Sequence, residues 1–170
     1  MSINNSIKNY LSKFFPALLL YVLAFSTFSE ISKIQDVSIF AFNGQMILIY
    51  FYVLKAPDDL GNGHIFLAGI INDVVSGMPL GVSSLSYLTL SFFTAYIRNA
   101  TLRPRMTAEW FTFIPALFFS NLVYFVIINN FSNLSFYYVE LLQSSFFTFL
   151  FFPIFYYIFS KIIKMSAANA

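Results

Sequence analysis

A lone acidic side chain is the residue of this sequence best placed to do chemistry. Asp73 is the only charged residue in the thirty-three positions from 65 to 97. An acid at the centre of a bilayer costs about 2.5–3.5 kcal/mol on insertion scales, so it rarely faces lipid. It faces a neighbouring helix or a wet cavity, where it can fix a bundle, contact a partner or relay protons. Asp73 therefore marks the place where function or assembly is expected.

Catalysis by Asp73 would need further groups that the sequence does not place beside it. Hydrolysis or transfer inside a membrane uses paired acids, a His-based dyad or a metal cluster. The chain has no Cys and a single His, His64, which excludes thiolate and multi-histidine metal sites. Asp58 and Asp59 near His64 are more typical of a solvated turn than of a metal site. We predict no catalytic residue, no metal and no cofactor.

The composition indicates that lipid is the solvent for most of the chain. Of 170 residues, 59% are hydrophobic and only 9% are charged, whereas a soluble domain carries about 25% charged residues. The 21% of aromatic residues would coat lipid-facing surfaces and the interfacial belts. A net charge of +2 without a basic patch argues against a nucleic-acid partner.

Six apolar segments must position Asp73, and they cover residues 14–32, 37–54, 65–80, 81–97, 110–128 and 138–160. Because a span needs about 20 residues, the third segment is short. Lys8 and Lys13 precede the first segment, which reads as a retained anchor rather than a signal peptide. We predict an all-α integral membrane protein of six transmembrane helices. Its membrane domain covers residues 14–160, between cytoplasmic tails at 1–13 and 161–170.

The distribution of Lys and Arg predicts the orientation. With six crossings and a cytoplasmic N-terminus, eight of the nine basic residues lie inside and only Lys33 lies outside. If the third segment dipped in and returned, three would lie inside and six outside. The positive-inside rule therefore favours six crossings with both termini in the cytoplasm.

The third segment has two different faces if it is helical. The small and polar residues share one face through the spacing i, i+3, i+4, i+7, i+8: Gly69, Asn72, Asp73, Ser76 and Gly77. Small residues four apart let another backbone approach closely, and Asn72 and Asp73 could hydrogen-bond across that contact. Gly77, Pro79 and Gly81 predict a helix end and a tight turn at the outer face, leading into the fourth segment.

Other polar side chains lie at membrane depth, namely Asn43, Gln45, Asn121 and Gln143. They could converge with Asp73 into one polar network, or each could make a local bond or face interfacial water. The sequence leaves both interpretations open.

These residues resemble a family signature. The pattern is Gly69-x-x-x-Asp73-x-x-x-Gly77-x-Pro79-Leu80-Gly81, then Leu85-Ser86-Tyr87. It is similar to that of the bacterial rod shape-determining protein MreD, in which an apolar helix carries one Asp before a Gly-x-Pro-Leu-Gly type turn. The resemblance covers about twenty residues, together with the chain length and hydropathy.

The resemblance implies a non-catalytic component of the inner-membrane machinery for cell elongation. Such proteins bind MreC, a bitopic protein, and through it reach MreB and the wall-synthesis enzymes. The resemblance also implies a bundle similar to the S-components of vitamin transporters, which makes a small-molecule carrier the alternative function. Asp73 would be a structural acid, a partner contact or, less simply, a proton relay. Homo-oligomerisation stays open.

Overall fold

The computed structural model describes residues 15–25, 42–100, 105–131 and 138–168. These ranges hold helices and no strands, as the sequence predicts. The helices are Phe15–Phe25, α2 (Gly44–Lys55), α3 (Asn62–Ser76), α4 (Val82–Ala100), α5 (Met106–Phe131) and α6 (Tyr138–Ala168).

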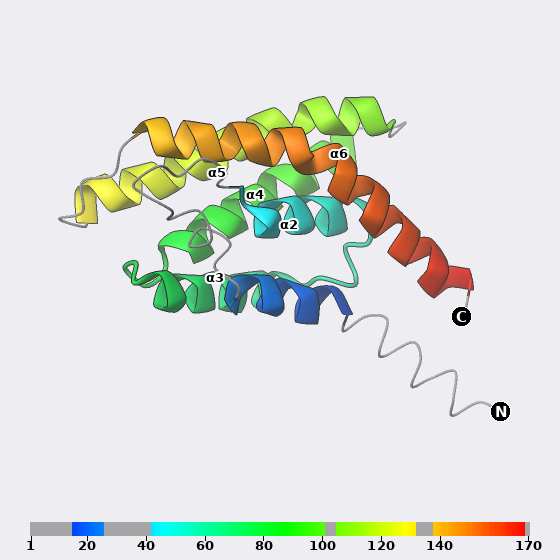
Figure 1. The fold of residues 1–170 in the computed structure, drawn as a ribbon, viewed down its shortest axis with the longest axis horizontal. Helices are drawn as coiled ribbons and strands as arrows, with labels where there is room; N and C mark the ends of the chain where they lie inside the picture. The colour runs from blue at the N-terminus through cyan, green and yellow to red at the C-terminus, as the bar shows by residue number, and fades with distance from the viewer. Residues whose placement is uncertain (1–14, 26–41, 101–104, 132–137, 169–170) are drawn as a thin grey trace, which may run out of the picture.

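Successive helices alternate in direction, so that the bundle has two ends (Figure 1). The Phe15–Phe25 helix, α3 and α5 run one way, and α2, α4 and α6 run the other way. The start of the first helix and the finish of α6 lie toward the same end. We call this end the terminal end and the end that holds the α3–α4 turn the turn end. Helix α4 packs against α2, α3 and α5.

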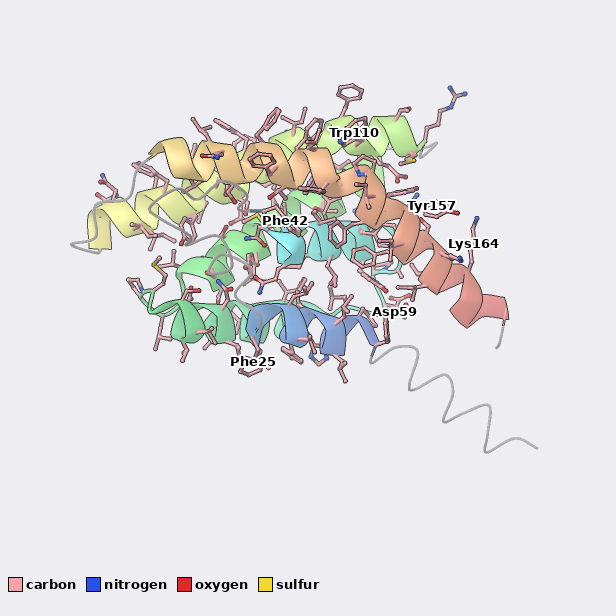
Figure 2. All side chains as sticks on the ribbon, viewed as in Figure 1. Phe25, Phe42, Asp59, Trp110, Tyr157 and Lys164 are labelled. Atoms are coloured by element: carbon pink, nitrogen blue, oxygen red, sulfur yellow. The ribbon has the colours of Figure 1, made fainter. Side chains whose placement is uncertain are left out.

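Two of the described helices are long and apolar enough to cross a bilayer. The stretches are Met106–Asn130 in α5 and Leu141–Lys164 in α6, with 25 and 24 residues. At 1.5 Å per residue each is about 36 Å long, against about 30 Å of hydrocarbon. Only 28% and 17% of their apolar windows are buried, unlike the core helix of a soluble protein. Outward side chains such as those of Phe25 and Tyr157, 65% and 71% exposed, are visible in Figure 2.

Helix α2 forms the core of the bundle. All of its residues from Gln45 to Val53 are buried. The Tyr50 ring lies 4.6 Å from that of Phe113 on α5, and the Phe51 ring lies 5.3 Å from that of Tyr156 on α6. Helix α2 begins where the Asn43 side chain accepts a hydrogen bond from the Met46 N–H at 3.1 Å.

Three of the differences between the helix limits and the predicted segments change the description of the fold. Helix α2 has 12 residues and is shorter than α3 with 15, although the third segment was expected to be the short one. Helix α3 ends at Ser76 rather than at residue 80, because Gly77 takes a left-handed conformation. Helix α6 continues past residue 160 to Ala168 and contains Pro153; Figure 1 shows a bend in this helix.

Candidate functional site

Asp73 lies inside the protein and binds the beginning of the next helix. The residue is 0% exposed. Its Oδ2 accepts a hydrogen bond from the Gly81 N–H at 2.8 Å, and its Oδ1 accepts one from the Ser83 N–H at 2.9 Å. The first N–H groups of a helix have no partner within the helix, and the N-terminal end favours a negative charge. The carboxylate of α3 therefore caps α4.

The turn between α3 and α4 brings this acid to its donors. Gly77 has φ of +65°, and the Met78 N–H donates to the Asp73 carbonyl at 2.9 Å, which closes the end of α3. Gly81 has φ of +101°, where L side chains are strained. The Pro79 carbonyl accepts from the Val82 N–H at 3.4 Å as α4 begins. The predicted turn thus reverses the chain in five residues.

Gly69 lets the backbones of α3 and α4 approach closely. A Cβ added at Gly69 would lie 2.4 Å from the Cα of Ser84, a distance that no packed structure tolerates. The Ser84 Oγ donates to the carbonyl of Phe66 at 3.0 Å across the same contact. Around Gly69 and Asp73, the small-residue face of α3 is therefore covered by α4 of the same chain, whereas Ser76 and Gly77 are exposed.

A chain of polar side chains extends from this contact into the core. The Asn72 Nδ2 donates to the Ser83 Oγ at 3.0 Å, and its Oδ1 accepts from the Gln45 Nε2 at 3.3 Å. The Tyr87 hydroxyl donates to the Gln45 Oε1. Helices α2, α3 and α4 are thus joined by side-chain hydrogen bonds beside Asp73.

The remaining predicted residues lie in different places. Asn43 caps α2, and its N–H donates to the Thr148 Oγ1 on α6 at 2.8 Å. Asn121 joins α5 to α6 through the Ser145 Oγ at 2.8 Å. Gln143 is half-buried on α6, and Ser76 is exposed at the end of α3. Of the four polar residues considered for a network with Asp73, Gln45 joins the group through Asn72, and Asn43 also reaches it through its side-chain hydrogen bond with Tyr87.

Among the polar contacts that sequence reasoning missed, one joins α4 to α5 and another joins α2 to α5. The Ser86 and Ser120 hydroxyls lie 2.7 Å apart, and each donates to the other residue's carbonyl, at 3.0 and 2.8 Å, which joins α4 to α5. The Lys55 Nζ lies 2.5 Å from the Glu109 Oε1, which joins α2 to α5. The signal for the second pair was available, since the topology places Lys55 and Glu109 at the same end of the bundle.

The arrangement around Asp73 has a structural role: it joins the end of α3 to the beginning of α4. We call this contact the α3–α4 joint. The partners of the Asp73 carboxylate are backbone N–H groups, so both of its oxygens are occupied as acceptors. Within the described ranges, no group of three or more His, Asp or Glu side chains could hold a metal ion. No family model, curated protein or solved structure matches this chain significantly.

Proposed function

We propose that this chain is a multi-pass protein of the bacterial inner membrane that acts, like MreD, as a non-catalytic part of the cell-elongation machinery. The chain crosses the bilayer six times with both termini in the cytoplasm, so that the terminal end is cytoplasmic and the turn end is periplasmic. Helices α2 and α3, with 12 and 15 residues, are shorter than the hydrocarbon core and cross it as parts of the bundle. It binds an MreC-type bitopic protein, and through it helps to organise lateral peptidoglycan synthesis and to maintain cell shape.

The observation that carries this proposal is that the motif residues all form the contact between α3 and α4. Gly69 admits the α4 backbone, Asp73 caps α4, and Gly77 and Gly81 take the positive φ angles of the turn. The residues that resemble the MreD signature are thus the ones that build one joint between two helices. A signature of this kind suits a scaffold, whose requirement is a fixed shape rather than a reactive group.

The position of Asp73 bears on where a partner would bind. Because α4 covers α3 at Gly69 and Asp73, these two residues would act on a partner by holding the bundle in shape. A partner's transmembrane helix would contact an outward face instead. Exposed apolar side chains on both α3 and α4, such as Val74 and Leu85, 64% and 50% exposed, project away from the joint.

The vitamin-carrier alternative would place a ligand among the polar side chains near Asp73. There, Asn72, Gln45 and Tyr87 are hydrogen-bonded to one another. The cleft described below lies toward the terminal end and has none of these residues in its lining. This distribution favours the scaffold.

The test is complementation together with co-purification. The gene is deleted in its native host, and the wild type, Asp73→Ala or the matched surface variant Asp58→Ala is expressed with an affinity tag. We expect rods and a co-purifying MreC-type protein with the wild type and Asp58→Ala. With Asp73→Ala we expect rounded cells and loss of the partner.

Two results would refute the proposal. Cells that stay rod-shaped after deletion would remove the role in shape. Capture of a vitamin transporter's ATPase module, with no MreC-type protein in the eluate, would instead support the carrier.

A further inference from the structure

A cleft of about 320 Å³ opens where α2 ends, α3 begins and α4 passes between them. Its volume lies at the lower end of the range for small-ligand sites. The apolar wall includes Leu88, Phe92 and Ala95 of α4, and the polar wall includes Asn62, Ser91 and Arg98. The Ser91 Oγ donates to the Asn62 Oδ1 at 3.0 Å, which ties the polar wall together. The cleft is thus apolar along one helix and polar at one end.

The apolar wall and Arg98 at its end together have the length of one bilayer leaflet. Leu88, Phe92, Ala95 and Arg98 are spaced i, i+4, i+7 and i+10, so they form one stripe along α4. At 1.5 Å per residue the stripe is about 15 Å long, which is half of the roughly 30 Å hydrocarbon core. Phe92 is 70% exposed, so the stripe is open at the side of the bundle. An acyl chain that enters from the bilayer could lie along it.

Arg98 places a fixed positive charge at the end of this stripe. Its Nη1 donates to the carbonyl of Val53 at the end of α2, at 2.9 Å, which holds the guanidinium in place. This is its one hydrogen bond to the described residues. A guanidinium carries five N–H donors, and four of them have no hydrogen bond to the described residues. Arginine binds phosphate oxygens through paired, charge-assisted hydrogen bonds.

The charges around the cleft favour a lipid phosphate over a free one. Asp58 and Asp59 lie in the loop between α2 and α3, which supplies part of the lining. They would repel a doubly charged phosphate ion more than a singly charged phosphodiester. A lipid also gains binding free energy from burial of its acyl chain, about 0.8 kcal/mol per CH₂, which a free ion lacks.

We propose that this cleft binds one glycerophospholipid from the leaflet at the terminal end. Its phosphodiester meets Arg98, and one acyl chain lies along Leu88, Phe92 and Ala95. This inference rests on the membrane placement proposed above but not on the role in cell shape.

Native mass spectrometry of the purified chain, titrated with phosphatidylglycerol or phosphatidylcholine in detergent, tests it. Arg98→Gln removes the charge, Ala95→Phe fills the apolar wall without changing charge, and exposed Arg105→Gln is the matched control. Since one basic residue near a membrane surface contributes about 1 kcal/mol, Arg98→Gln should weaken phosphatidylglycerol binding about fivefold or more. Ala95→Phe should weaken both lipids, and Arg105→Gln should change either by less than about twofold.

Several outcomes would overturn the inference. Equal losses in Arg98→Gln and Arg105→Gln would mean diffuse attraction rather than a site. Unchanged binding in a folded Ala95→Phe would leave no acyl chain in the cleft, even if Arg98→Gln failed to fold. Displacement of the lipid by inorganic phosphate at equal concentration would indicate a free-anion site. Capture of a polypeptide by a photo-crosslinker at position 95 would assign the cleft to a protein.

The lipid measurement is independent of the proposed role in cell shape. It uses the purified chain without any partner. A chain that restores rod shape but binds no lipid in the cleft would refute this inference alone. A chain that binds the lipid but fails in complementation would refute the shape role alone.

Discussion

Replacing Asp73 by Ala should destabilise the bundle more than removing any loop charge. The substitution deletes both acceptors of the Gly81 and Ser83 N–H groups, at 2.8 and 2.9 Å. It leaves the Ser83 N–H buried without an acceptor, and it leaves the Gly81 N–H half-buried. Asp58→Ala is the matched control, since it makes the same chemical change at an exposed loop position.

The expected loss of stability follows from the free energy of hydrogen bonds in soluble proteins and in membrane proteins. Hydrogen bonds to charged groups contribute about 1.5–3 kcal/mol each in soluble proteins. Interhelical hydrogen bonds in a membrane protein average about 0.6 kcal/mol and reach about 1.7, because the unfolded state in the membrane also finds partners. The two N–H groups at the beginning of α4 have no partner within that helix, which places Asp73 at the upper membrane value or above it. We expect a loss of about 2–4 kcal/mol, which is roughly a 30- to 900-fold change in the unfolding equilibrium.

Reversible unfolding of the purified protein in mixed micelles, titrated with SDS, measures this loss. The chain's single Trp is an intrinsic probe, because the Trp110 Nε1 donates to the carbonyl of Phe149 at 2.9 Å and reports the α5–α6 contact. The reasoning is wrong if Asp73→Ala lowers the free energy of unfolding by no more than Asp58→Ala, which should stay within about 0.5 kcal/mol of the wild type.

Two further substitutions test the joints of the bundle. Gly69→Ala should cost about 1–3 kcal/mol by the same SDS titration, because its Cβ would lie 2.4 Å from the Ser84 Cα. Gly63→Ala, with nothing within 4 Å of the added Cβ, should be neutral or stabilising, and equal losses at both glycines would contradict this packing. Lys55→Met should cost about 1–3 kcal/mol because it leaves the Glu109 carboxylate, which is 4% exposed, without its ion-pair partner. This cost is below that of a fully buried ion pair because the Lys55 side chain is 27% exposed. Adding Glu109→Gln should recover most of the loss, and a purely additive double variant would show that the two groups do not interact.

The position of the site followed from the cost of placing a polar group in lipid. An acid among apolar residues has to face inward, so the inward side of α3 could be assigned from Asp73 and Gly69 alone. The turn after α3 followed from Gly77, because a glycine in the left-handed conformation is the common way to close a helix, although the predicted segment extended to residue 80. These inferences need no knowledge of the neighbouring helix.

The identity of that neighbour and the centre of the bundle could not be obtained in this way. Lipid tails are as apolar as leucine side chains, so an apolar residue in a membrane segment shows no preference between lipid and protein. Helix α2 is buried from Gln45 to Val53, yet its composition is as apolar as that of α5 and α6, which are mostly exposed. Only the packing partners distinguish them, and those depend on contacts between residues far apart in the sequence.

The turn explains why an acid was needed on α3 at all. Helices are usually capped by a Ser, Thr, Asp or Asn side chain at the residue before the first turn. Here that residue is Gly81, whose φ of +101° disfavours any side chain, so the tight reversal removes the local cap. Asp73, which comes one turn before the end of α3, supplies the missing acceptor from the other side of the reversal. Asp73, Gly77 and Gly81 therefore act together. A chain with a longer turn could cap α4 with a local side chain, and would have no structural need for a buried carboxylate on α3.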